Sequence, residues 1–364
     1  MGIARLCGAQ RWDTIGRMAQ HDLSHAAQDI LETGLLNNWY LVCRASEVGP
    51  GPLKLKRLNQ DIVLWRDQSG GVRAIEDYCP HRGAPLSLGF VIEGKITCAY
   101  HGLQIDGDGV IAATPPTPDS PFVGNKCVKS YPVREAAGAI FLWFGDALHQ
   151  EPPEMWLPEE LASDEWSYFL YTATWKANYL VTLDNRLDPL HGSYLHGDSY
   201  TLSYGRKEAQ LKIADIDDGF EVWRDNQRGV NIDRTWMAHT PGQNYWIRTE
   251  IPYPKASGGN MFRIGGYPTP VDRDTTYFWV FRSQKNAGWR RDMWRFLYKN
   301  RLERRHNAVV DQDKVMLESM PLAARQRELL LQTDLGVVRI RRIWRLEAEH
   351  QARALAEAPR QAAE

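Results

Sequence analysis

Two pairs of cysteine and histidine carry the clearest chemistry in the sequence. The pairs are Cys79-x-His81 and Cys98-x2-His101, separated by 16 residues, and each has a nearby Gly or Pro where the chain can turn tightly. Thiolate and imidazole ligands together allow either a structural zinc or a two-iron cluster. A zinc finger usually takes both cysteines from one knuckle and both histidines from another. Because each pair here supplies one of each, the spacing favours a two-iron cluster with mixed ligands.

The segment from residue 79 to residue 102 resembles the C-x-H-R-G…C-x-Y-H-G motif of the Rieske non-haem iron oxygenases. The resemblance implies that Cys79 and Cys98 bind one iron of a Rieske [2Fe-2S] cluster and that His81 and His101 bind the other. Neutral imidazoles in place of two thiolates raise the reduction potential to roughly −150 to +300 mV, against about −400 mV for a plant-type ferredoxin. Such a cluster accepts electrons readily from a reductase.

A second group of polar residues follows between residues 178 and 196. Asp184, Asp188 and His191 are spaced to share one face of a helix, whereas an ideal helix would place His196 about 140° from His191. We expect a kink or π-bulge at Pro189 to bring the two imidazoles together. The stretch resembles the family's D-x-x-H-x4-H motif. The resemblance implies that His191 and His196 bind a mononuclear iron and that Asp188 is the catalytic bridging acid, with Asp184 as the alternative.

An iron site with two histidines needs one carboxylate more, and open positions for oxygen. The acidic segment from residue 310 to residue 318 resembles the late segment in which the family places this ligand. The resemblance implies that Asp313 is the third ligand. Asp311 and Glu318 are alternatives, and a solvated helical face is the reading without a metal.

Length and charge bound the class of protein. The chain has 364 residues and a net charge of −1, so it is long enough for two domains and has no overall field that would attract nucleic acid or anionic lipid. No apolar run reaches the roughly 20 residues of a membrane span, and the start has no run of signal-peptide length. We expect a cytoplasmic protein that binds neither nucleic acid nor membrane. The cysteines outside the knuckles, Cys7, Cys43 and Cys127, are expected to be free thiols.

The periodicity predicts short strands first and longer strands later. Alternating runs at residues 53–58, 62–65 and 72–75 indicate an antiparallel meander, and the prolines at 152–158 indicate a boundary near residue 150. Long alternating segments then predict a wide antiparallel sheet. They lie at residues 209–216, 220–224, 245–251, 261–266 and 275–281. Residues 289–313 have a helical pattern, and residues 337–357 are expected to pack on the sheet as a strand or a helix.

The resemblance covers about residues 37 to 320 and implies an α+β fold. An antiparallel β Rieske domain would occupy residues 37–150. A catalytic domain with a large antiparallel sheet covered by helices, of the helix-grip type, would occupy residues 151–364. Residues 1–36 would form an N-terminal helical segment that packs on the catalytic domain.

The function implied by the resemblance is that of a terminal oxygenase (alpha) component of a ring-hydroxylating system. Electrons from NAD(P)H would reach the cluster through a reductase, with or without a ferredoxin, and pass to the mononuclear Fe(II), where O2 is activated. The expected substrate is a small aromatic compound, carboxylated or not, in aromatic hydrocarbon catabolism, and the expected assembly is a homotrimer.

Three other functions remain open on the sequence. A Rieske monooxygenase or O-demethylase, acting on an aryl ether or a non-aromatic ring, would use the same ligands. A Rieske electron carrier without catalysis would lack the second iron, and the segments at 184–196 and 311–318 argue against it. A zinc-stapled binding protein would be colourless, whereas a Rieske protein is brown.

Overall fold

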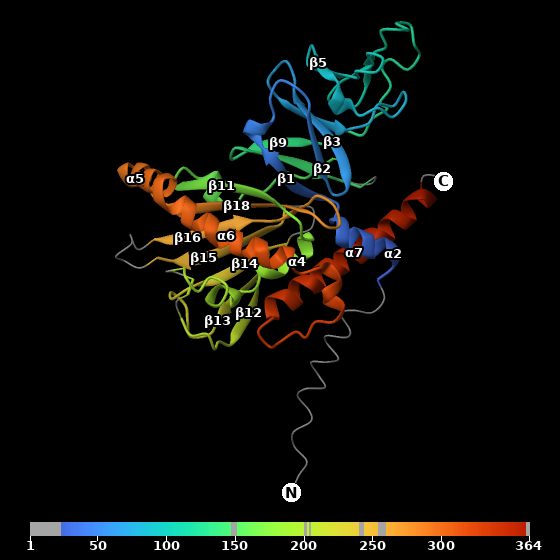
Figure 1. The fold of residues 1–364 in the computed structure, drawn as a ribbon. Helices are drawn as coiled ribbons and strands as arrows, with labels where there is room; N and C mark the ends of the chain where they lie inside the picture. The colour runs from blue at the N-terminus through green and yellow to red at the C-terminus, as the bar shows by residue number, and fades with distance from the viewer. Residues whose placement is uncertain are drawn as a thin grey trace.

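The computed structural model describes residues 23–146, 151–199, 202–203, 205–239, 244–253 and 260–361. Figure 1 shows small sheets gathered at one end of the molecule and a large sheet with long helices at the other. The first 22 residues of the expected N-terminal segment, with Cys7, lie outside the described residues, and so does the expected boundary, within residues 147–150. No helix in the described ranges is long and apolar enough to cross a membrane.

Ten short strands in the first part of the chain form three small antiparallel sheets, as the meander pattern predicts. The strand orders are β1-β10-β9, β2-β3-β4 and β5-β6-β7-β8. The strands are β1 (Asn38–Arg44), β2 (Leu53–Arg57), β3 (Gln60–Arg66), β4 (Val72–Glu76), β5 (Phe90–Ile92), β6 (Lys95–Thr97), β7 (Gln104–Ile105), β8 (Ile111–Ala113), β9 (Val133–Ala136) and β10 (Ala139–Phe144).

Two-residue turns in the left-handed region close three of these hairpins. Residues 58–59 join β2 to β3, residues 93–94 join β5 to β6, and residues 137–138 join β9 to β10, all with φ between 47° and 75°. Positive φ at both positions gives the turn whose twist matches that of the paired strands. The first of these turns takes in residue 58, the last residue of the alternating run predicted at 53–58.

The large sheet is antiparallel throughout, and the strand order of its main path is β11-β18-β16-β15-β14-β13-β12, with β17 paired to β18. The strands are β11 (Trp166–Trp175), β12 (Leu211–Ile216), β13 (Gly219–Arg224), β14 (Arg234–Ala238), β15 (Trp246–Pro252), β16 (Met261–Gly266), β17 (Thr269–Pro270) and β18 (Thr276–Lys285). The pairing of β11 with β18 runs the full length of both strands. Strand β14 is missing from the sequence prediction because its five residues, RTWMA, do not alternate.

The helices of the described chain are α2 (His25–Thr33), α3 (Glu159–Ala162), α4 (Tyr179–Arg186), α5 (Trp289–Leu297), α6 (Glu303–Glu318) and α7 (Leu335–Gln361). Figure 1 shows α5 and α6 running across the large sheet, with α2 beside α7. The side chain of Gln351 on α7 bonds both the N–H and the carbonyl of Leu36, which fastens the segment after α2 to α7. The C-terminal segment is therefore a helix, and the alternative of a strand is wrong.

The expected helical stripe of Asp184, Asp188 and His191 is wrong. Helix α4 ends at Arg186, because the proline at 189 disfavours helical backbone at the residue before it and has no N–H to donate. A π-helix does occur, but at residues 298–302 between α5 and α6. The chain turns sharply after α4 instead of continuing with a kink.

The side chain of Asp184 ties α4 to the C-terminal helix. Its carboxylate accepts hydrogen bonds from Arg325 and from Arg341, the latter at 2.6 Å. The three side chains keep between 17% and 20% of their surface exposed, so the ion pairs are largely shielded from water. Asp184 is therefore placed to support the fold and not to bridge two metal centres.

We predict that Asp184→Ala destabilises the fold by about 3 kcal/mol, because it leaves two largely buried guanidinium groups without their shared carboxylate. Urea unfolding followed by tryptophan fluorescence measures the change. Asp217→Ala, at an exposed position, serves as the control. Equal stability of the two variants would contradict the assigned role.

Candidate metal centres

The two Cys-His knuckles have the same backbone bonding. In each, the cysteine N–H donates to the carbonyl of the residue five positions later at 2.9 Å, and the glycine N–H donates back to the cysteine carbonyl at 2.8 or 2.9 Å. The two glycines, Gly83 and Gly102, have φ of 78° and 74°, a region that residues with a Cβ rarely adopt. The second knuckle lies between two strands, since β6 ends at Thr97 and β7 begins at Gln104.

The knuckles place two thiols inside and two imidazoles at the rim. Cys79 and Cys98 are each 2% exposed and belong to an apolar cluster with Trp65. His81 is exposed and His101 is half-buried, and their ring centroids are 4.7 Å apart. All four predicted residues therefore meet at one place, with the histidines toward the surface.

Two observations fit a cluster held between the knuckles. The Nδ1 atom of His101 is buried and has no hydrogen-bond partner among the described residues, which costs free energy unless a ligand takes that position. Burial raises the pKa of the Cys79 thiol, and the neighbouring Cys98 raises it further. Iron would reverse this effect, because a coordinated thiol is deprotonated outright. By contrast, Cys43 and Cys127 are free thiols outside the knuckles, as expected.

The second site brings His191, His196 and Asp313 together. One donor atom from each lies within 4.8 Å of the others. Within the described ranges, no other three or more His, Cys, Asp or Glu side chains come together in this way. An oxygen of Asp313 is 3.2 Å from His196 Nε2 and 3.6 Å from His191 Nε2. His196 and Asp313 are buried, and His191 is partly buried. Two imidazoles and one carboxylate on a small centre are the donor set of a non-haem Fe(II) site.

The backbone explains how residues so far apart in the sequence meet. After α4 ends, a short 3-10 turn at His191–Ser193 carries the first imidazole, and His196 follows on the next turn. Asp313 comes from the buried face of α6, with Val310 and Leu317 on the same face. The spacing of three and four residues around Asp313 places all three on one side of the helix.

Each imidazole is held through its other nitrogen. His191 Nδ1 lies 2.6 Å from the backbone carbonyl of Asp188, and His196 Nδ1 lies 2.9 Å from Oε1 of Gln312. With Nδ1 donating to an oxygen, the lone pair of each ring is on Nε2, which is the atom that faces Asp313. Asn185 donates to the same Asp313 oxygen at 3.2 Å.

Asp188 lies beside His191, but its carboxylate does not accept the ring N–H. One carboxylate oxygen accepts from the N–H of Leu190 at 2.8 Å, and the other is 3.7 Å from His191 Nδ1. Burial lowers the pKa of His191, but Asp188 and Asp313 outweigh it and raise the pKa overall. The site thus attracts a proton when it holds no metal, and a metal cation would take the proton's place.

The two alternative carboxylates lie elsewhere on α6. Asp311 is exposed. Burial raises the pKa of Tyr171, and the nearby charge of Asp311 raises it further. Glu318 accepts from the N–H of Lys176 at 2.8 Å. Asn185 and Gln312 were not predicted from the sequence as supporting residues. Their positions could have indicated them, because Asn185 lies between Asp184 and Asp188 and Gln312 comes immediately before Asp313.

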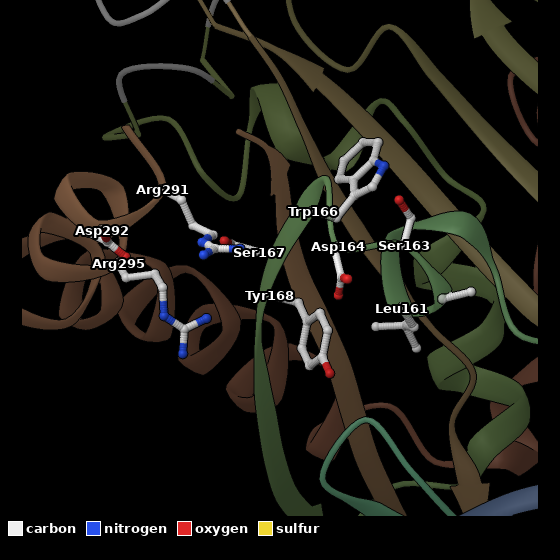
Figure 2. A pocket seen from close by; sticks show the side chains of 10 residues that line it. Leu161, Ser163, Asp164, Trp166, Ser167, Tyr168, Arg291, Asp292 and Arg295 are labelled. Carbon is white, nitrogen blue, oxygen red and sulfur yellow. The ribbon is translucent and has the colours of Figure 1, made fainter. Parts of the chain in front are cut away.

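A surface pocket of about 410 Å³ lies between the α3–β11 connection and α5, away from these residues. Figure 2 shows Arg291 and Arg295 of α5 on one side and Asp164 and Tyr168 on the other. None of the motif residues lines it. It is therefore not part of either candidate metal centre.

Comparison with known proteins follows the same division of the chain. Residues 38–132 match the Rieske [2Fe-2S] domain family, and residues 175–349 match the vanillate O-demethylase oxygenase C-terminal domain family. The vanillate O-demethylase oxygenase subunit of Pseudomonas sp. strain ATCC 19151 is 30% identical over 331 residues, which cover 78% of this chain and 93% of that protein. The chain belongs to the Rieske non-haem iron oxygenases. The vanillate O-demethylase oxygenase subunit of Pseudomonas sp. strain HR199 is 39% identical over 172 residues, which cover 47% of this chain and 47% of that protein.

Solved structures show that the fold is shared as well. Dicamba monooxygenase bound to 3,6-dichlorosalicylic acid is 22% identical, with a TM-score of 0.69 over 87% of this chain and 98% of that one. The carbazole 1,9a-dioxygenase oxygenase, in complex with its ferredoxin, is 22% identical with a TM-score of 0.71 over 93% of this chain and 94% of that one. The expected α+β architecture is confirmed.

The family membership settles the general activity. The protein is the terminal oxygenase component of a Rieske system, with a Rieske cluster, a mononuclear iron, O2 and electrons from a reductase. The cluster fits between the knuckles, where a buried imidazole nitrogen and two buried thiols meet. The iron fits the three converging donors at the second site. The electron-carrier and zinc-stapled alternatives are therefore set aside.

We predict that Asp313→Ala removes the mononuclear iron and leaves the two cluster irons and the Rieske spectrum unchanged, because the two sites share no residue. Iron analysis combined with EPR of the reduced protein measures both centres in one sample. Asp311→Ala is the matched control and should keep all the iron. Iron loss in Asp311→Ala with iron retained in Asp313→Ala would move the ligand to Asp311.

Proposed function

We propose that this oxygenase removes the methyl group of a methoxylated aromatic acid. The observation that carries the proposal is the position of the iron-type donor set within the segment that matches the vanillate O-demethylase C-terminal family. Two relatives are named vanillate O-demethylase oxygenase subunits, and a third is named dicamba O-demethylase oxygenase component. The sequence alone leaves O-demethylation open as the alternative to ring hydroxylation, and the names of these relatives favour O-demethylation.

The overall reaction balances with the cofactors of the family. An aryl methyl ether, O2, two electrons and two protons give a phenol, formaldehyde and water. The new C–O bond forms at the methyl carbon, and the resulting hemiacetal then breaks its bond to the aryl oxygen. When bound, the iron supplies oxygen activation, and the protein supplies its ligands and excludes water.

The assignment of residues to the two centres belongs to the same proposal. Cys79 and Cys98 would hold one cluster iron, and His81 and His101 the other. His191, His196 and Asp313 would hold the Fe(II). The amides of Asn185 and Gln312 support this arrangement, because they fix the carboxylate and one imidazole from outside. Such outer partners typically change metal affinity by about 10- to 100-fold.

Asp188 is proposed to link the two centres across subunits of a homotrimer. In Figure 1 the sheet that holds the knuckles lies at one end of the molecule, whereas α4 and α6 lie at the other. The Asp188 side chain is 29% exposed beside His191, so a histidine of a neighbouring subunit could reach it. A reductase, with or without a ferredoxin, would then deliver electrons at the exposed His81.

We also propose the domain division expected from the sequence, with the cluster domain at residues 37–150, the catalytic domain at 151–364 and an N-terminal segment at 1–36. The cytoplasmic location and a role in aromatic catabolism stay predictions.

We predict that Asp188→Asn binds both metals and accepts electrons at the cluster, yet forms almost no product, because a neutral amide is a weaker acceptor than a carboxylate for the N–H of the neighbouring subunit's imidazole. Stopped-flow reoxidation of the reduced cluster, with product quantified in the same samples, separates electron transfer from metal loss. Asp198→Asn, an exposed acid on the same loop, should behave as wild type. Normal turnover by Asp188→Asn would remove Asp188 from the electron path.

The demethylation itself is tested with the reconstituted enzyme, a reductase and 4-hydroxy-3-methoxybenzoate under 18O2. We expect one formaldehyde for each dihydroxybenzoate formed, with the phenol oxygen unlabelled because it comes from the ether. Asp313→Ala is the inactive control. A ring-hydroxylated product without formaldehyde would contradict demethylation and support the ring-hydroxylating alternative, whereas no product from any methoxylated or unmethoxylated aromatic acid would contradict both.

A further inference from the structure

Arg186 is the last residue of α4, and the sequence leads from it directly to Asp188 and His191. Its side chain reaches across to the large sheet. The guanidinium Nη2 donates to the carbonyl of Ile264 on β16 at 3.0 Å and approaches that of Ile247 on β15 at 3.4 Å. The residue thus connects the metal-bearing turn with the middle of the sheet.

The charge of this arginine has no close counter-ion among the described residues. Its Nε is buried without a hydrogen-bond partner there, and no described carboxylate forms an ion pair with it. Arg234 and Arg263 on neighbouring strands, in contrast, both bond to Glu250. Burial lowers the pKa of Arg186 to about 10, although Asp313 opposes the change, so the side chain remains a cation at neutral pH.

Apolar side chains surround this region between the sheet and α6. Leu202, Ile232 and Phe262 belong to one buried cluster, against which Ile264 packs. A Cβ placed on Gly192, in the turn of His191, would lie 3.6 Å from Ile232 and 3.9 Å from Leu202. The apolar cluster therefore borders both the metal-bearing turn and the strand that Arg186 bonds.

The electrostatic balance near Arg186 becomes more positive once iron is bound. Fe(II) with two neutral imidazoles and the Asp313 carboxylate keeps a net positive charge, so Asp313 no longer compensates Arg186. The charge of Asp188 acts on the buried Arg224, whose pKa it raises against the larger, lowering effect of burial. Two backbone carbonyls satisfy one nitrogen of Arg186 but cannot neutralise its charge.

We propose that Arg186 binds the carboxylate of the aromatic substrate and selects for anionic substrates. This inference rests on the proposed function. It adds the charge of the substrate and the residue that binds the charged group. The carbonyls of Ile264 and Ile247 occupy Nη2, so a carboxylate would accept a charge-assisted hydrogen bond from one of the other nitrogens of the guanidinium. The carboxylate would pair with Arg186, which forms no ion pair within the described residues and lies beside the apolar cluster. Arg186 is thus a specificity-determining residue and not a metal ligand.

The test compares two ligands of nearly equal shape, 4-hydroxy-3-methoxybenzoate and the uncharged 4-hydroxy-3-methoxybenzyl alcohol. Binding to the iron-loaded, oxidised enzyme is measured by calorimetry without reductase, so that no turnover takes place. We expect the wild type to bind the acid about ten-fold more tightly than the alcohol, as a charge-assisted hydrogen bond allows. Equal affinity of the wild type for the two compounds would overturn the proposal.

Variants at the same position locate the effect. Arg186→Gln should lose the preference for the acid and keep the affinity for the alcohol, whereas Arg186→Lys should lose only part of the preference. Arg342→Gln, which removes an exposed arginine, is the control and should match the wild type. A preference for the acid that survives in Arg186→Gln, at wild-type iron content and melting temperature, would overturn the proposal. If Arg186→Gln loses iron, the result for Arg186→Lys is used instead. The inference is overturned if Arg186→Lys keeps the wild-type preference for the acid, or if its affinity falls equally for the acid and the alcohol.

Turnover separates this inference from the proposed function. If the wild type releases formaldehyde from both compounds and binds them equally, demethylation stands and the role of Arg186 falls. If the iron-loaded wild type binds the acid through Arg186 but releases formaldehyde from neither compound, the binding role stands and the proposed demethylation falls.

Discussion

The metal centre depends on the direction in which two imidazoles are held. A histidine ring can rotate and can carry its proton on either nitrogen, so proximity alone does not make a ligand. In this protein the backbone carbonyl of Asp188 and the amide of Gln312 occupy the two Nδ1 atoms, which leaves both Nε2 atoms facing Asp313. The abrupt end of α4 makes this possible, because a continuing helix would carry His191 and His196 to different faces.

Charge is distributed unevenly around this centre, and burial gives the imbalance its strength. Arg234 and Arg263 on the large sheet both meet Glu250. Asp184 is likewise paired, with two arginines. Arg186 forms no ion pair within the described residues, and it lies close enough to Asp313 for that carboxylate to raise its pKa against the larger, lowering effect of burial. A binding site that must attract an anion beside a metal is where such an unpaired cation is useful, since the ligand completes the pair.

The candidate ligands converge as the sequence suggested, but the backbone that holds them differs from the prediction. The seven proposed ligands come together in two groups of four and three, because residue type and spacing limit which metals can be bound. The helical stripe through Asp184 failed, since helical periodicity takes no account of the proline that ends α4. Strand β14 was missed because its buried residues do not alternate. Arg186, Asn185 and Gln312 gave no periodic signal, because their roles depend on contacts between distant segments.

The proposed function requires two separate iron centres, one between the two knuckles and one at the triad of His191, His196 and Asp313. A crystal structure of the iron-loaded protein, with anomalous data collected at the iron edge, tests this requirement most directly. We expect one strong peak between Cys79, Cys98, His81 and His101, and a second, weaker peak bound by Nε2 of both triad histidines and by the Asp313 carboxylate. A second peak at other residues, or no peak at this triad in protein with full iron content, would contradict it.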